Sequence, residues 1–148
     1  MTDKSTLIAL ADKLEKATAP SRELDALIAC ACNIRPDWLR GDTRKLVATG
    51  RGHVSAGKHG PGFDAPAYTA SIDAALTLRP DGWLLTGLSD GILDPKYRDV
   101  RSLTKWLTGM ARLGAVVNGP QDAGGMVSSM GANPAISVAA AALRAHAA

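Results

Sequence analysis

Apolar residues recur at intervals of three and four along the first part of the chain. Between residues 5 and 17 this stripe consists of Leu7, Leu10, Ala11 and Leu14. Such spacing places all four side chains on one face of a helix, so an amphipathic helix is predicted over 5–17. Ser5 is the expected N-cap because its hydroxyl can accept a hydrogen bond from a free amide of the first turn.

A second helix is predicted directly after the first. Pro20 ends the first segment, Ser21 is the expected N-cap of the next helix, and Arg35-Pro36 stops it. Its expected apolar face comprises Leu24, Leu27, Ile28 and Ala31. The two segments together predict a helical hairpin, which we interpret as structural.

The pattern breaks down between residues 36 and 67. Nine glycines and prolines interrupt this stretch, and the only apolar run within it is Leu46-Val47-Ala48. We therefore expect a glycine-rich loop insertion at about 36–67, and long loops inside compact domains are usually functional or disordered.

Helical and extended patterns alternate in the rest of the chain. Thr69 or Ser71 is expected to cap a third helix, which Pro80 closes. Strands are predicted over 83–86 and 110–117, whereas 97–109 fits a helix or a strand equally well. The glycines around 124–131 predict another flexible loop.

Asn133-Pro134 is a strong start signal for a last helix, with Asn as N-cap and Pro in the first turn. Its expected apolar face is narrow and comprises Ile136, Ala139, Ala140 and Leu143. Strands between flanking helices predict the α/β class. We expect one domain over 1–148, a small layered sandwich whose central sheet packs between the N-terminal helical hairpin, the middle helix and the C-terminal helix.

Composition places the chain among globular proteins. It has 148 residues, a mass of 15.3 kDa, 46% apolar residues and a net charge of +3. Charge is segregated along the chain, with −1 over 1–34, +4 over 35–59, −4 over 60–95, +4 over 96–112 and 0 over 113–148. Two interpretations of the basic stretches stay open: a solvated surface of mixed charge, and local patches that bind an anionic ligand.

The string from Gly52 to His59 matches the first seven positions of the phosphate-binding G-x-x-x-x-G-K-[ST] motif. The motif also needs Ser or Thr at its last position and a helix directly after it. Here His59 and then Gly60-Pro61-Gly62 follow, which argues against a nucleotide hydrolase. A weaker anion-binding loop remains, with Arg51, His53, Lys58 and His59 as candidate ligand contacts.

Three further residues complete the candidate ligand-binding set: Tyr68, Lys105 and Trp106. No arrangement of catalytic residues is recognisable, and neither a cofactor nor a metal is expected, because the histidines lack the companions of a metal motif. Cys30 and Cys32 point to different sides of a predicted helix, so they are expected to be free thiols.

Three blocks of the sequence resemble a known family. They are ATAPSRELD at 17–25, PAYTASIDAAL at 66–76, and NPA at 133–135 running into AAALRA at 140–145. Together they resemble the phage ABA sandwich domain, found in phage and prophage proteins. The resemblance implies a sheet between helical layers and a phage origin, and it carries no catalytic residues to this chain.

These observations support several functional hypotheses. The first is a non-enzymatic phage accessory protein that counters host defence by sequestering an anionic, cyclic nucleotide messenger in the host cytoplasm. The alternative is a protein–protein inhibitor or assembly factor that acts on a host or phage protein and forms a homo-oligomer, with Trp38 in the interface. A nucleic-acid-binding module is a further alternative, and an enzyme is the last. No membrane partner is expected, since no apolar run approaches the length of a membrane span.

Overall fold

A computed structural model describes the chain except for residues 1–2, 82, 91–107, 116–125, 130 and 148. The helices are α1 (Lys4–Lys16), α2 (Arg22–Ala31), α3 (Ile72–Leu76) and α5 (Pro134–Ala147), with a short 3-10 turn η1 (Asp37–Leu39). The strands are β1 (Leu46–Gly50), β2 (His53–Ala56), β3 (Gly62–Asp64), β4 (Trp83–Asp90), β5 (Thr108–Ala115) and β6 (Met126–Ser129). No helix in the described ranges is long and apolar enough to cross a lipid bilayer.

Both helices of the N-terminal hairpin form as predicted, but only Ile28 of the apolar face predicted for α2 is buried, and Leu27 is exposed. All four residues of the predicted stripe on α1 are buried. The helix begins one residue before Ser5, however, and Asp3 takes the N-cap position, so the prediction for Ser5 was wrong. Ser21 caps α2 as predicted, because its hydroxyl accepts a hydrogen bond from the Leu24 amide at 3.3 Å.

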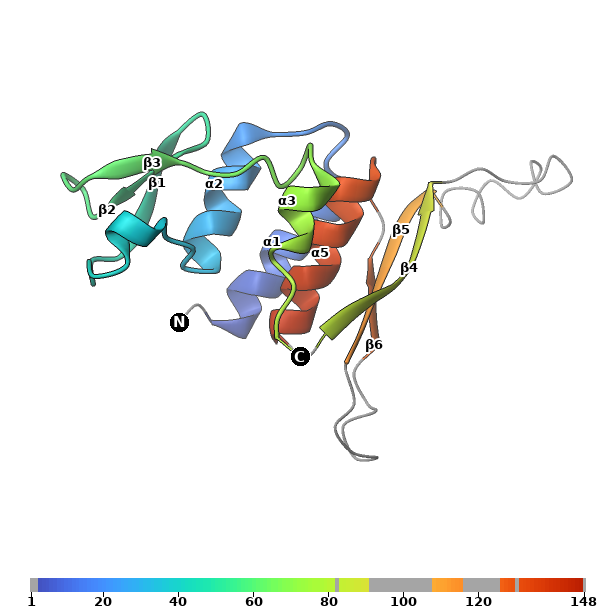
Figure 1. The fold of residues 1–148 in the computed structure, drawn as a ribbon. Helices are drawn as coiled ribbons and strands as arrows, with labels where there is room; N and C mark the ends of the chain where they lie inside the picture. The colour runs from blue at the N-terminus through green and yellow to red at the C-terminus, as the bar shows by residue number, and fades with distance from the viewer. Residues whose placement is uncertain (1–2, 82, 91–107, 116–125, 130, 148) are drawn as a thin grey trace, which may run out of the picture.

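Helix α5 lies at the centre of the molecule. It contacts α1 and α3 on one side and the β4–β5–β6 sheet on the other (Figure 1). Its N-cap is Asn133 as predicted, whose side-chain oxygen accepts from the Ile136 amide at 2.8 Å. The narrow apolar face is a wrong prediction, because the helix is buried almost all round. Alanines on its remaining sides let neighbouring elements approach closely.

The strands form two separate antiparallel sheets of three strands each, ordered β1-β2-β3 and β4-β5-β6. The second sheet contains both predicted strands, β4 in longer form and β5 shifted two residues towards the N-terminus, and β6 lies where a flexible loop was expected. The prediction for 97–109 falls almost entirely outside the described residues.

The glycine-rich segment is not the long loop that we expected. Residues 36–67 contain η1 and the whole β1–β2–β3 meander. The register pairs Val47 with Ser55 and Ala48 with Val54, and Val54 pairs with Phe63. Val54 is fully buried, and the meander packs against α2 through this face. Short strands joined by glycine turns show too little periodicity to be recognised in the sequence.

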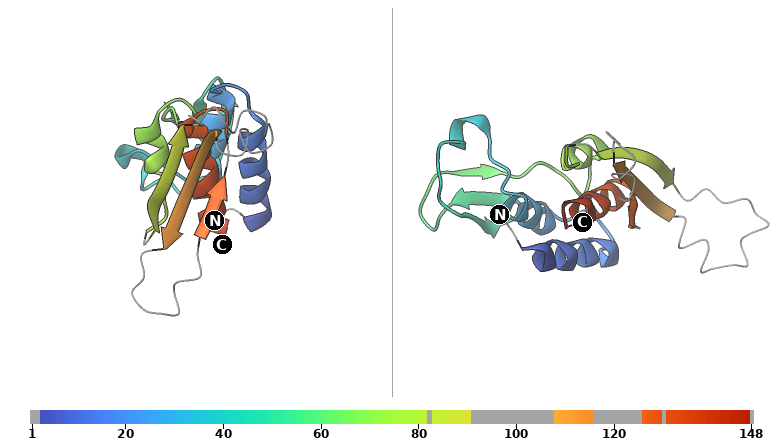
Figure 2. Two further views of the ribbon diagram at one scale, coloured as in Figure 1. Left: turned by 90° about the vertical axis from the view of Figure 1, so that its right-hand side faces the viewer. Right: turned by 90° about the horizontal axis from the view of Figure 1, so that it is seen from below.

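The α/β class is confirmed, with helices packed on a sheet. Figure 2 shows the helices between the two sheets, which lie at opposite ends of the molecule. The β1–β2–β3 meander rests on α2, and the β4–β5–β6 sheet rests on α5. This arrangement leaves the first sheet beside the helical hairpin, where the candidate site is found.

Candidate functional site

The four candidate contacts of the predicted anion-binding loop do not form one loop. Arg51 lies in the two-residue turn between β1 and β2, and His53 is the first residue of β2. Lys58 and His59 lie in the next turn, between β2 and β3. Because successive turns of an antiparallel meander lie at opposite ends of their shared strand, the two pairs are separated by the length of β2.

The same geometry argues against a phosphate-binding loop at residues 52–59. Gly52 has a φ of 82° and completes the left-handed β1–β2 turn with Arg51, whose φ is 41°. The residues between Gly52 and Gly57 form β2, which pairs with strands on both sides. Amides that are engaged in a sheet cannot wrap around a phosphate.

His53 has a local partner. Its Nδ1 lies 3.2 Å from Asp64 Oδ1 on the neighbouring strand β3, and both side chains are exposed. Since the two residues are directly paired in the register, this contact is a cross-strand pair on the sheet surface.

Tyr68 is a core residue. It is fully buried, and burial, together with the nearby Cys32 and Asp25, raises the pKa of its hydroxyl. Tyr68 is therefore a buried side chain, whereas Arg51 and His53 are exposed. The two other candidates, Lys105 and Trp106, lie outside the described residues.

A cavity of about 760 Å³ opens instead between α1, the end of α2 and the start of β1. Three cationic side chains line it, Lys13 from α1, Arg35 after α2, and Lys45 before β1, against the single carboxylate of Asp3. The apolar part of the wall comprises Ala9, Leu10, Leu27, Ala31 and Leu46. Its size and mixed lining are typical of a small-molecule site.

The chain turns sharply after α2 and so brings Arg35 to the cavity. Asn33 adopts a left-handed φ of 51°, and the Ile34 amide donates back to the Ala29 carbonyl at 2.9 Å. Arg35 then donates through Nη2 to the Arg44 carbonyl. Its Nη1 is buried and has no hydrogen-bond partner among the described residues. A buried charged donor of this kind favours an anionic partner.

A second depression adjoins the cavity and shares Asn33, Arg35 and Thr43 with it. Asp42 also lines this depression, but its carboxylate is engaged by the Arg44 guanidinium through Nε at 3.0 Å and through Nη2. Hydrogen bonds from Arg44 lower the pKa of Asp42 to about 2. Asp42 therefore stays ionised, with its charge balanced mainly by Arg44 and to a smaller extent by Arg35.

The thiols near the cavity are poorly suited to nucleophilic chemistry. Cys30 lines the cavity, and burial raises the pKa of its thiol while the charge of Lys45 opposes part of that rise. Burial also raises the pKa of Cys32 to about 11. Both side chains stay protonated at neutral pH. The described residues contain no group of three or more His, Cys, Asp or Glu side chains that could hold a metal ion.

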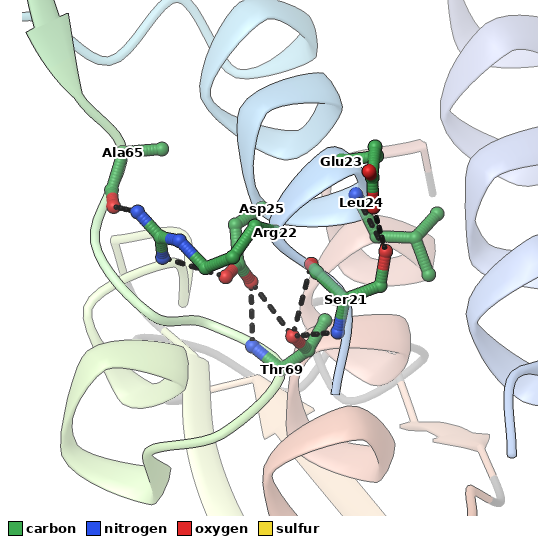
Figure 3. Close-up of polar contacts among 7 residues, drawn as sticks. All are labelled: Ser21, Arg22, Glu23, Leu24, Asp25, Ala65 and Thr69. Carbon is green, nitrogen blue, oxygen red and sulfur yellow. Dashed lines mark hydrogen bonds and ion pairs between the residues drawn. The ribbon is translucent and has the colours of Figure 1, made fainter. Parts of the chain in front are cut away.

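A buried polar cluster holds the meander against α2 (Figure 3). Asp25 is 1% exposed, and its Oδ1 accepts from the Thr69 amide at 2.8 Å and from the Thr69 hydroxyl at 2.9 Å. Its Oδ2 accepts from Arg22 Nη1 at 2.8 Å, and Arg22 Nη2 donates to the Ala65 carbonyl at 2.6 Å. The cluster thus joins α2 to the segment that follows β3.

The Arg22 guanidinium also lies against Gly52. A Cβ at position 52 would lie 2.6 Å from Arg22 Nε, so any larger residue would displace this side chain. Gly52 is therefore required both for its left-handed φ and for the close approach of Arg22. We refer to Arg22, Asp25 and Thr69 as the polar clamp.

The cations that line the cavity differ from those that the sequence suggested, although two of them lie in the same basic stretch. Arg35 and Lys45 belong to the +4 segment 35–59, yet Arg51 and Lys58 were chosen for their proximity to glycines. Lys13 was missed because a lysine on the polar face of a helix normally has no partner but water. Asn33 carried a usable signal, because asparagine after a helix is common in the left-handed position.

No family model, curated protein or solved structure matches the chain. The resemblance to the phage ABA sandwich domain therefore stays an expectation from the sequence.

Proposed function

We propose that the protein is a non-enzymatic binding protein that holds a small organic anion in the cavity between α1, α2 and β1. The observation that carries this proposal is the lining of that cavity, in which Lys13, Arg35 and Lys45 face only one carboxylate. The buried, unpartnered Nη1 of Arg35 adds a donor that an anionic group would satisfy.

The lining also limits the kind of anion. Leu10, Leu27 and Leu46 form an apolar wall beside the cations, which a bare inorganic ion would leave uncovered. A ligand with a flat or aliphatic body and a charged group would bury both parts. Nucleotides have this combination, and the volume of about 760 Å³ is adequate for one.

In biological terms, we propose that the protein sequesters a nucleotide messenger and so counters host defence. This proposal is motivated by the phage-family resemblance and by the anionic chemistry that the cavity favours. Cys30 is the cysteine in the cavity lining, and its raised pKa keeps the thiol protonated at neutral pH. A protonated thiol is a poor nucleophile, so the cavity is better suited to holding a ligand than to transforming it.

Isothermal titration calorimetry with a panel of linear and cyclic nucleotides tests the proposal. We expect at least one nucleotide to bind, and Arg35→Gln or Lys13→Gln to weaken its binding roughly tenfold through loss of a charged contact. Lys13→Gln keeps the test valid if loss of the Arg35–Arg44 contact destabilises the protein. Lys58→Gln, an exposed site in the β2–β3 turn, is the matched control.

Heat from no nucleotide would reject the nucleotide form of the proposal. An equal loss in Lys58→Gln would reject this cavity as the site, since Lys58 is not part of its lining.

An interaction protein is the second candidate, and Trp38 favours it. This side chain is 63% exposed on η1, and tryptophan is enriched at the energetic centres of protein interfaces. Light scattering of wild type and Trp38→Ala would show a change in oligomeric state if Trp38 mediates self-association. Unchanged monomers in both would remove the homo-oligomer from consideration.

A further inference from the structure

Strand β1 lies at the edge of its sheet. Its one strand partner in the described structure is β2, and Val47 pairs with Ser55 across that ladder. The Gly57 amide donates to the Lys45 carbonyl at 2.8 Å, which shows that the backbone of Lys45 faces β2. Because alternate residues of an antiparallel strand face the partner, the backbone groups of Leu46 and Ala48 face the open edge.

Positive charge gathers along this edge. Arg44 precedes β1, and its carbonyl accepts a hydrogen bond from the Arg35 guanidinium. Lys45 is exposed beside it. Asp42, which precedes this edge in the chain, is paired with Arg44. An incoming strand would therefore meet cations at the end where β1 begins.

The outer face of the edge also has an apolar position. Val47 is 41% exposed, and it lies on the same face of the strand as Lys45 because side chains alternate. A partner strand that placed an aliphatic residue opposite Val47 would cover it.

We propose that the open edge of β1 binds an extended acidic segment of a partner protein by strand addition. Its carboxylate lies opposite Lys45, and an aliphatic residue two positions away lies opposite Val47. Backbone hydrogen bonds to Leu46 and Ala48 supply the pairing, as in other strand-addition complexes. The inference goes beyond the small-anion proposal because it uses the outward-facing backbone of β1, although Arg35, Lys45 and Leu46 also line the cavity.

Charge favours an acidic segment over a second copy of this chain as the strand that pairs with the β1 edge. Residues 35–59 carry a net charge of +4, so pairing two β1 edges would bring two strongly basic segments together. An acidic partner strand instead gains attraction at Lys45 and Arg35.

Titration with the capped peptide Thr-Thr-Val-Thr-Glu-Thr, followed by backbone amide shifts in NMR spectra, tests the inference. We expect shifts at Leu46 and Ala48, and about tenfold weaker binding to Lys45→Glu, because reversal turns attraction into repulsion. A peptide with Lys in place of Glu should restore binding to Lys45→Glu. Lys58→Glu, equally exposed but in the β2–β3 turn, should bind the first peptide like wild type.

A backbone test separates strand addition from simple charge attraction. Ala48→Pro removes an outward-facing amide at an edge position, where proline is tolerated, and should abolish the shifts without a change in charge. Its folding is checked by circular dichroism.

Normal peptide binding by a folded Ala48→Pro variant, or no rescue by the Lys peptide, would overturn the inference. Concentration-dependent self-association lost in Ala48→Pro would assign the edge to a second copy and would also overturn it. Nucleotide titration of Ala48→Pro, which leaves the cavity lining unchanged, keeps failure of this inference distinct from failure of the cavity proposal.

Discussion

Removing one buried hydroxyl from the polar clamp should cost much of the stability of this protein. Thr69 is fully buried, and its hydroxyl donates to Asp25 at 2.9 Å and accepts from the Ser21 amide at 2.9 Å. Thr69→Val keeps the shape of the side chain but loses both bonds. The bond to the carboxylate contributes about 1.5–3 kcal/mol and the bond from the amide about 1 kcal/mol.

We therefore expect Thr69→Val to lower the free energy of unfolding by about 2–4 kcal/mol, since the Ser21 amide and Asp25 also lose a buried partner. Urea unfolding followed by circular dichroism measures this change, and with a typical dependence on denaturant the midpoint should fall by about 1–2 M. Thr77→Val is the matched control, because the Thr77 hydroxyl donates to the Ala74 carbonyl on an exposed surface.

The control should change the free energy of unfolding by less than about 0.5 kcal/mol. Equal effects of Thr69→Val and Thr77→Val would refute the reasoning, because burial is what makes the Thr69 hydroxyl valuable. An unchanged midpoint for Thr69→Val would show that Asp25 is satisfied by Arg22 and the Thr69 amide alone.

Three further predictions concern other parts of the fold. Gly60→Ala should unfold or loosen the meander, because a Cβ there would lie 1.7 Å from the Ala56 carbonyl oxygen, and faster amide hydrogen exchange of β2 and β3 would show it. Cys32, whose pKa is raised to about 11, should react with iodoacetamide at pH 8 at least about tenfold more slowly in the native protein than in urea, as mass spectrometry can measure. The contact between Asp42 and Arg44 lowers the pKa of Asp42 from 3.8 to about 2, so its stabilisation is complete above pH 4 and is lost as the pH falls towards 2. The melting temperature of wild type should fall over this pH range, and Asp42→Asn should lack the part of that fall that comes from protonation of Asp42.

Local signals in the sequence predicted much of the helical framework. The four-residue stripe of α1 and the side-chain caps at Ser21, Ser71 and Asn133 each depend on residues within one or two helical turns. Such contacts form wherever the chain becomes helical, so short-range patterns suffice to recognise them.

Features that depend on distant residues were not predictable. Nothing near Asp25 in the sequence marks it as buried, because its partner Thr69 is 44 positions away. Helix α5 is buried on nearly all sides, and a run of alanines shows no periodicity that would reveal it. The candidate site was missed for the same reason, since Lys13, Arg35 and Lys45 meet only when the helical hairpin and the meander are in place.

The cavity and the polar clamp are mechanically related, because both depend on where the meander sits relative to α2. The start of β1 forms one wall of the cavity, whereas the clamp holds the other end of the same sheet through Gly52 and Ala65. A ligand that bridges α1 and β1 would add a second attachment between the sheet and the helices. Thr69→Val removes one hydroxyl of the clamp while Arg22 still holds Ala65, so a ligand bound to the folded form should stabilise this variant as it stabilises wild type, by an amount set by its concentration and affinity.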